Sequence, residues 1–187
     1  MKLKSKWPVR RFFAFLGALY LFCAVTPLLF AESGTAKSES VFRIYDTATE
    51  TVRTVNDLDF LCGALPCEMA VSAPDEALKA QIIAIHTLYD RKRRENTGKD
   101  FDFTCDSAEK SIYTVDAGLT DEEQNRVRAL CLSVLDKEIY FENEPINACY
   151  FAISAGCTQP FENVWPEKSH PYLTAVACPS DLLAQGF

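Results

Sequence analysis

The sequence predicts an α+β fold, a single domain in which short β-hairpins pack against two amphipathic helices. Three observations predict it: a strand–turn–strand pattern near residue 41, two stripes of apolar residues at helical spacing, and a second hairpin pattern after them. Strands and helices that occur in separate blocks favour α+β over a doubly wound sheet. The 187 residues, 48% apolar and 24% charged, fit one globular domain.

The first hairpin is predicted from "VFRIYDTATETVRTVN", in which residues 41–45 and 51–55 alternate on either side of a polar turn. The stretch "DLDFLCGAL" that follows predicts a short helix. Asn56 or Asp57 is its expected N-cap, because short polar side chains accept hydrogen bonds from the first free backbone N–H groups.

Two longer helices are predicted from apolar residues three or four positions apart. The first follows Ser72, a candidate cap, with Pro74 near its first turn and acidic residues at its positive end. The second begins at Thr120, which with Glu123 fits a capping box. The expected core stripes are Leu78, Ile82, Ile85 and Tyr89 on the first helix, and Val127, Leu130, Cys131 and Val134 on the second.

The second hairpin is predicted at residues 138–154, where two β-rich runs flank Asn143-Glu144-Pro145. Residues 95–118 carry loop residues with weak strand signals. The tail after residue 155 is mostly loop, with one apolar strand expected at residues 173–177.

The first 31 residues form a cytoplasmic tip and a membrane-targeting segment. Lysines and arginines precede an uncharged run at residues 12–31, which is long enough to span a bilayer. We expect a signal anchor that leaves the rest of the chain outside the membrane. A cleaved signal peptide, and so a secreted protein, is the alternative. Residues 32–40 are predicted to be a linker and residues 41–187 the exported domain.

The net charge of −7 argues against a nucleic-acid partner, because no basic face is available to displace phosphate counterions. Seven cysteines follow the apolar run, in a compartment where disulfides can form. They are expected to be buried small hydrophobes or to form one or two disulfides of undetermined pairing. Their spacing does not indicate a closed zinc site.

Two stretches carry a family resemblance. "CEMAVSAPDEALKAQIIAIHTLY" resembles the signature of the stage II sporulation protein D and amidase-enhancer family, in which an E-M pair precedes a "P-x-EALKAQAVAART"-like helix. The later stretch "EIYFENEPINACYFAISAGCTQPFENVWPEKSHPYLTAVACPSD" is similar to the family's run of a strand, a turn, "Y-F-x-x-S-x-G-x-T", a Trp and "PYL-x-x-V-x-x-P-x-D".

The resemblance implies a lytic transglycosylase that cuts peptidoglycan between N-acetylmuramic acid and N-acetylglucosamine and leaves a 1,6-anhydro end. Glu68 matches the family's catalytic glutamate. A glycosidase that uses water normally needs two carboxylates, but here the C6 hydroxyl of the sugar attacks, so one residue can act as acid and then as base. Leu65, Cys67 and Met69 are expected to surround its carboxyl group with apolar atoms.

The resemblance also implies that Ser154, Gly156 and Thr158 line the glycan cleft, although a Gly-bearing turn is an equally ordinary interpretation. Trp165 and Tyr172 are candidates to stack on sugar rings, with a core position as the alternative. His86 stands where the family has an arginine, and it is either a hydrogen-bond donor near the site or a structural histidine.

Other departures from the family pattern shape the remaining expectations. Ala70 replaces a proline, and Cys105 matches only the first residue of a zinc cluster found in some relatives, so we expect no metal and no cofactor. The segment that closes the family's domain does not occur before Phe187, so a C-terminally short domain is expected. This leaves a non-catalytic wall protein, which binds glycan or stimulates an amidase, as the alternative. The implied partners are peptidoglycan glycan strands, a cell-wall amidase and membrane sporulation proteins.

Overall fold

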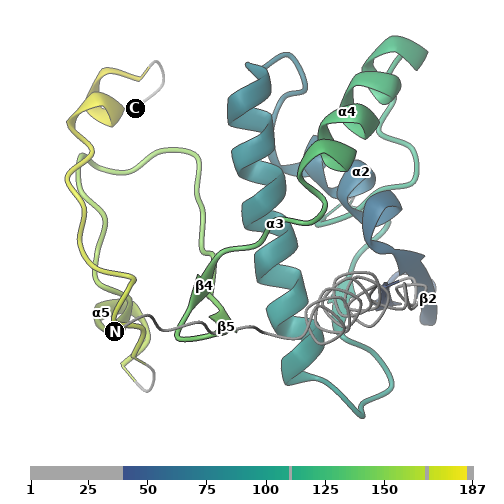
Figure 1. The fold of residues 1–187 in the computed structure, drawn as a ribbon, viewed down its shortest axis with the longest axis horizontal. Helices are drawn as coiled ribbons and strands as arrows, with labels where there is room; N and C mark the ends of the chain where they lie inside the picture. Colours follow the sequence, from purple (N-terminus) through teal and green to yellow (C-terminus); the bar gives the residue numbers. More distant parts are fainter. Residues whose placement is uncertain (1–39, 110, 167–168, 185–187) are drawn as a thin grey trace, which may run out of the picture. The chain divides into compact units, whose positions relative to one another are not determined.

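A computed structural model of the chain describes residues 40–109, 111–166 and 169–184 (Figure 1). The predicted membrane-targeting segment and most of the predicted linker therefore lie outside the described residues. Within the described ranges, no helix has both the length and the apolar character needed to cross a membrane. The described part is mixed α and β, with two small sheets and the helices α2 to α5.

The larger sheet has the order β2-β1-β3. The strands β1 (Val41–Asp46) and β2 (Thr51–Asn56) pair antiparallel, which confirms the first predicted hairpin. The strand β3 (Phe103–Cys105) comes from the segment with weak strand signals and pairs parallel to β1. Asp102 fixes this pairing, because its carboxylate accepts a hydrogen bond from the backbone N–H of Arg43 at 2.8 Å.

The helix α2 (Asp57–Glu68) is the predicted short helix, with Asn56 as its N-cap, but it is longer than expected. It continues through Pro66, which lies in the last turn, where its fixed φ is compatible with a helix although one donor is lost. Gly63 allows a close approach of the segment before α4: a Cβ there would lie 2.4 Å from the carbonyl oxygen of Thr114.

The two predicted amphipathic helices are α3 (Asp75–Glu95) and α4 (Asp121–Val134). Both predicted stripes are buried, and the capping box of Thr120 and Glu123 is present. Ser72 is not the cap of α3: the helix begins after Pro74, which has no side chain that can accept a hydrogen bond.

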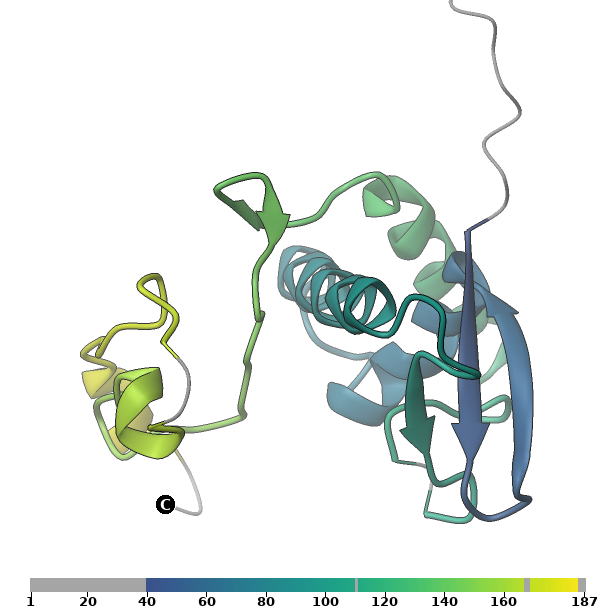
Figure 2. The same cartoon turned by 90° about the horizontal axis from the view of Figure 1, so that it is seen from below.

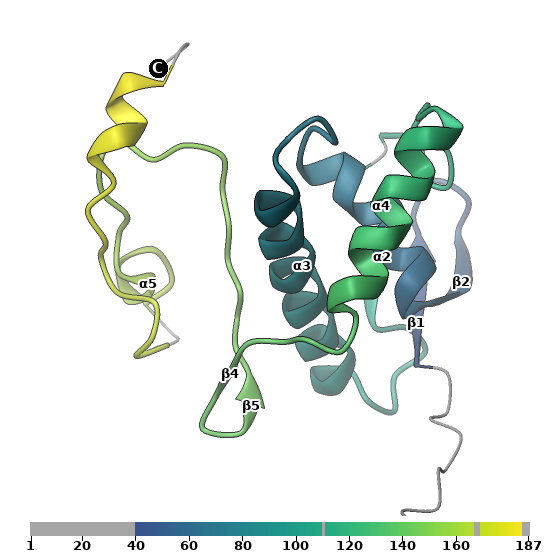
Figure 3. The same ribbon diagram turned by 45° about the horizontal axis from the view of Figure 1, so that its top comes forward.

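The helices α2, α3 and α4 pack against one another (Figure 3), and α2 and α3 also contact the sheet, which Figure 2 shows beside them. The core between helices and sheet is rich in aromatic rings with centroids 4.5–5.7 Å apart. These rings belong to Phe42, Phe60, Tyr89 and Phe103.

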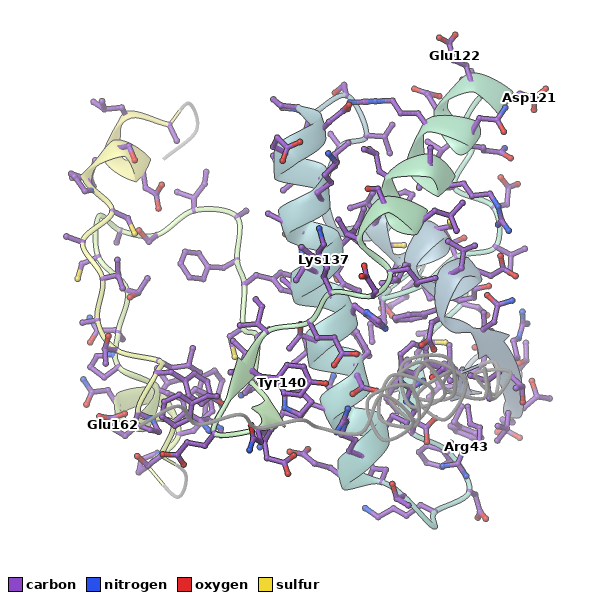
Figure 4. All side chains as sticks on the ribbon, viewed as in Figure 1. Arg43, Asp121, Glu122, Lys137, Tyr140 and Glu162 are labelled. Carbon is purple, nitrogen blue, oxygen red and sulfur yellow. The ribbon has the colours of Figure 1, made fainter. Side chains whose placement is uncertain are left out.

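The second predicted hairpin is present but much shorter than expected, because only β4 (Tyr140–Phe141) and β5 (Glu144–Pro145) pair. Glu142 and Asn143 turn the chain with positive φ angles of 50° and 66°, which suits a tight hairpin. Tyr140, labelled in Figure 4, lies on β4, where its hydroxyl accepts a hydrogen bond from Arg94 at 3.2 Å.

The tail contains α5 (Phe161–Val164) and the 3-10 helix η1 (Pro179–Leu183), neither of which was predicted. The prediction of a strand at residues 173–177 is wrong. In that segment the structure has only a single β-bridge, between Cys157 and Ala177. Two backbone hydrogen bonds hold the segments at this bridge, from Thr158 to Val176 at 2.9 Å and from Cys178 to Gly156 at 2.8 Å. The Thr158 hydroxyl also accepts a hydrogen bond from the backbone N–H of Val176 at 2.8 Å.

Candidate functional site

Glu68 is the last residue of α2, and its side chain is exposed. The helix ends there because Met69 adopts extended backbone angles, with its N–H still donating to the carbonyl of Leu65 at 3.0 Å. The last turn of α2 holds no basic residue. A carboxylate at the negative end of a helix dipole does not favour helix stability, and such placements are typical of functional positions.

The chain between Glu68 and α3 is held by Arg126 on α4. Its guanidinium donates to the carbonyl oxygens of Val71 and Ala73, the latter at 2.9 Å. It also pairs with the carboxylate of Asp75 at the start of α3. Three helices therefore meet around the loop that follows Glu68, and this fixes where its backbone lies.

Tyr150 lies near Glu68, and the Glu68 carboxylate interacts with its hydroxyl. Tyr150 is half-buried and packs against the core, in the segment after β5. Burial raises the pKa of Tyr150 well above its ordinary value, and the negative charge of Glu68 raises it further. Tyr150 therefore keeps its proton and remains a hydrogen-bond donor.

Tyr89 of α3 is a second phenol on which the charge of Glu68 acts. Burial, and then the charge of Glu68, raises the pKa of Tyr89. The Lys92 ammonium lies 4.6 Å from the centre of the Tyr89 ring, and burial lowers the pKa of this lysine. The charge of the Glu68 carboxylate thus acts on two phenols, those of Tyr89 and Tyr150.

The expected apolar enclosure of Glu68 is not found. Leu65 faces the core and is fully buried, while Cys67 and Met69 are half-buried and leave the carboxylate exposed. Three surface cavities, of about 350, 270 and 800 Å³, are lined by other residues. The reason is geometric: successive residues at a helix end point in different directions, so sequence neighbours do not surround one another.

Ser154, Gly156 and Thr158 bond to the end of the tail and not to Glu68, within the described residues. The backbone N–H and hydroxyl of Ser154 both donate to the carboxylate of Asp181, at 2.8 and 2.7 Å. Gly156 has a φ of +86°, and a Cβ there would lie 3.1 Å from Leu182. These residues shape one turn of the tail, and their binding role stays a prediction.

Trp165 and Tyr172 belong to an aromatic group in the tail. Trp165 is exposed and stacks on Phe161 at 4.5 Å, so one face of its indole is available. Tyr172 is half-buried, with its hydroxyl 3.2 Å from Nδ1 of His170, and accepts a hydrogen bond from the backbone N–H of Asn147. Trp165 is therefore the more accessible candidate for stacking on a sugar.

His86 lies at the other end of α2 from Glu68. It is buried, with Nε2 at 3.4 Å from the carboxylate of Asp57 and 3.8 Å from that of Glu138. Arg93 also binds Asp57, at 2.9 Å. The twelve residues of α2 separate the two ends by roughly 16 Å. This position supports the structural interpretation of His86.

The cysteines and the candidate metal ligands are other side chains that could belong to the site. The free thiols among the described residues include Cys62, Cys105, Cys131, Cys149, Cys157 and Cys178. In the described ranges, no three histidine, cysteine, aspartate or glutamate side chains come together as a metal site would require.

Sequence reasoning missed Tyr150, although it is the tyrosine of the quoted "Y-F-x-x-S" run. Nothing in that run indicates that its phenol reaches a glutamate 82 residues earlier. The family resemblance draws attention to the Ser, Gly and Thr of this motif. In the structure it is the first residue of the motif, Tyr150, that lies near Glu68.

Comparisons with known proteins agree with the resemblance. Residues 45–133 match the family model described as stage II sporulation protein. The chain is 26% identical over 148 residues to stage II sporulation protein D of Bacillus subtilis (strain 168), and 28% identical over 148 residues to that of Bacillus amyloliquefaciens. Each alignment covers 74% of this chain and 43% of the relative, so the chain spans less than half the length of these relatives. These matches support the stage II sporulation protein D family as the one to which this chain is similar.

Proposed function

We propose that this protein is a lytic transglycosylase that cleaves the glycan strands of bacterial peptidoglycan, with Glu68 as general acid and base. Similarity to the family supports the coarser part, a role in sporulation and the cell wall. One observation supports the finer part: Glu68 of the first motif is exposed and lies near Tyr150 of the second, whose hydroxyl it affects. The proposal includes a location outside the membrane, as residues 1–31 predict.

In the proposed reaction, the carboxyl group of Glu68 gives its proton to the glycosidic oxygen as the bond from C1 of N-acetylmuramic acid breaks. The C6 hydroxyl of the same sugar then bonds to C1, and Glu68 takes up the hydroxyl proton. No water is consumed, and the product carries a 1,6-anhydro bridge. Before it reacts, Glu68 must hold a proton, so a bound glycan has to cover the exposed carboxyl group and displace water from it.

Tyr150 is a positioning residue in this scheme. Its high pKa keeps the phenol protonated, so the hydroxyl can hold one side of the Glu68 carboxyl group. The exposed side of the carboxyl group then remains available to the glycan. Trp165, with one indole face exposed, is the candidate to stack on a neighbouring sugar.

The test is the substitution Glu68→Gln, which keeps the size of the side chain but removes the transferable proton. Release of anhydro-muropeptides from purified glycan strands, measured by mass spectrometry, should fall by about 10² to 10⁴. Glu76→Gln is the matched control, because Glu76 is an exposed glutamate in the first turn of α3 that pairs only locally, with Lys79 at 2.7 Å. Full activity of Glu68→Gln, or loss of activity in a folded Glu76→Gln, contradicts the assignment.

A second candidate function is a non-catalytic wall protein that binds glycan or stimulates a cell-wall amidase. The exposure of Glu68 favours it, because the carboxyl group lacks the apolar surroundings typical of a general acid. Incubation of the protein with purified glycan strands distinguishes the two functions. Sedimentation of the protein with intact glycan strands, without anhydro products, would support the binding protein.

A further inference from the structure

Two cysteines from different helices meet beside α2, at a position that the proposed reaction does not use. The helices α2 and α4 are in contact, and across this contact the thiols of Cys62 on α2 and Cys131 on α4 interact. Cys131 is fully buried in the core, and Cys62 is half-buried and packs against it. Both are free thiols.

A second contact between the same helices supports the pairing. Arg128 of α4 donates to the carboxylate of Asp59 of α2 at 3.0 Å. Cys62 lies three residues after Asp59, and Cys131 three residues after Arg128, so both pairs join residues 69 apart in the chain. Residues three apart share one face of a helix. The ion pair and the thiol pair therefore both lie at the contact between α2 and α4.

A small molecule can reach Cys62 from solvent. Cys62 lines a cavity of about 350 Å³, together with Asp59, Tyr113 and Arg128. Cys131 does not line it. An attacking reagent therefore meets Cys62 first, with Cys131 directly behind it.

The charges around the pair assign the two thiols different roles. The interaction with Cys131, and then the positive charge of Arg128, lowers the pKa of Cys62. The same contact and burial raise the pKa of Cys131. Because the thiolate is the nucleophile in exchange, Cys62 reacts first and Cys131 resolves.

We infer that Cys62 and Cys131 are a site of disulfide formation that cross-links α2 to α4. The oxidant is a disulfide, either a small one or the disulfide of a thiol-exchange protein. The Cys62 thiolate attacks one of its sulfurs and forms a mixed disulfide, releasing the first thiolate. Cys131 then loses its proton and attacks the Cys62 sulfur, and the second donor thiolate leaves with that proton. Two protein thiols are oxidised and the donor disulfide is reduced to two thiols.

The cross-link would fix α2, whose last residue is Glu68, against α4. It closes a loop of about 70 residues, and long loops lose the most chain entropy in the unfolded state when they are cross-linked. The unfolding midpoint of the oxidised protein is therefore expected to rise by roughly 5 to 15 °C.

The experiment uses the full chain, purified reduced in detergent and treated with oxidised glutathione. Free thiols are then alkylated, and the digest is analysed by mass spectrometry without reduction. We expect one linked pair of peptides that contains Cys62 and Cys131, while the exposed Cys149 and Cys157 are recovered alkylated or with glutathione attached. The linked pair and the higher midpoint should appear together.

Two variants separate the cross-link from other effects. Cys62→Ser changes the half-buried partner, so it should keep the fold while losing both the linked pair and the rise in midpoint. Cys149→Ser, at an exposed position, should keep both. Recovery of Cys62 as a stable glutathione adduct without linkage to Cys131, or of both thiols alkylated, would overturn the inference. None of these readouts depends on glycan cleavage.

Discussion

Arg126 of α4 binds Asp75, the first residue of α3, with Nε at 3.1 Å from the carboxylate. The same guanidinium donates to the carbonyl oxygens of Val71 and Ala73, so one side chain ties α4 to the loop between Glu68 and α3. A carbonyl oxygen that loses a charged donor must find water instead. The position of the Glu68 backbone thus depends on a residue far from it in sequence.

Arg126→Ala should therefore weaken both the fold and the proposed cleavage. We expect the free energy of unfolding in urea to fall by about 1 to 3 kcal/mol, because two carbonyl bonds to a charged donor are lost. Arg126→Lys restores a charge but not the forked geometry, and should recover only part of the loss. Equal stability of all three proteins would show that the loop holds its shape without Arg126.

The core stripe of α3 can be tested at Ile82, which is fully buried. Ile82→Ala leaves a cavity between the helices, and its free energy of unfolding should fall by about 2 to 4 kcal/mol. Leu132→Ala is the control, because this leucine lies on α4 with more than half of its surface exposed. Its stability should change by less than about 0.5 kcal/mol. Similar losses in both variants would mean that the stripe is not the core.

Gly63 is predicted to be sensitive to a single methyl group. Its Cβ would lie 2.4 Å from the carbonyl oxygen of Thr114 and 2.5 Å from the Tyr113 ring, and backbone atoms cannot easily move aside. Gly63→Ala should lower the free energy of unfolding by about 1 to 3 kcal/mol, although alanine is the better helix former. Thermal melts of the two proteins measure this, and an increase in stability would contradict the close contact.

Acid should destabilise the domain in part through Asp46. A hydrogen bond from Ser107 is the largest cause that lowers the pKa of Asp46 below its ordinary value of 3.8. A carboxylate with a lowered folded pKa contributes stability above its unfolded pKa, and the contribution is lost as pH falls through the folded pKa. The stability of Asp46→Asn should therefore approach that of the unmodified protein below pH ~4. Urea titrations between pH 3 and pH 7 measure the difference, and a constant gap across this range would contradict the prediction.

The elements that sequence reasoning found are those with strong local signals. The capping box of Thr120 and Glu123 and the stripe from Leu78 to Tyr89 are defined by residues three or four apart, so no knowledge of the fold is needed. The strand β3 is different, because its three residues become a strand only by pairing with β1, from which they are separated by α2 and α3.

The residues of the candidate site show the same contrast between features with a local sequence signal and features that depend on the fold. A motif predicts Glu68, but its position near Tyr150 depends on how the segment after β5 packs against the core. The position of His86 beside Asp57 was also unpredictable, because it follows from the contact of α2 with α3. Side chains that meet across helices leave no periodic trace in the sequence.

Tyr150→Phe tests whether the phenol positions Glu68. The ring and its packing remain, but the hydroxyl that interacts with Glu68 is lost. If this interaction orients the carboxyl group, kcat for anhydro-muropeptide release should fall by about 10- to 100-fold while KM stays nearly constant. A purely structural role would instead lower the unfolding midpoint and leave the kcat of the folded protein unchanged.

Tyr140→Phe is the matched control, because the Tyr140 hydroxyl donates to a glutamate, Glu138, at 2.6 Å. This pair lies at β4, beside the end of α3 that carries Arg94 and away from Glu68. Its loss removes a bond between a phenol and a carboxylate at a position that the proposed reaction does not use, so cleavage should be unaffected. If Tyr140→Phe lowers kcat as much as Tyr150→Phe, the effect is not specific to Glu68, and Tyr150 has no positioning role.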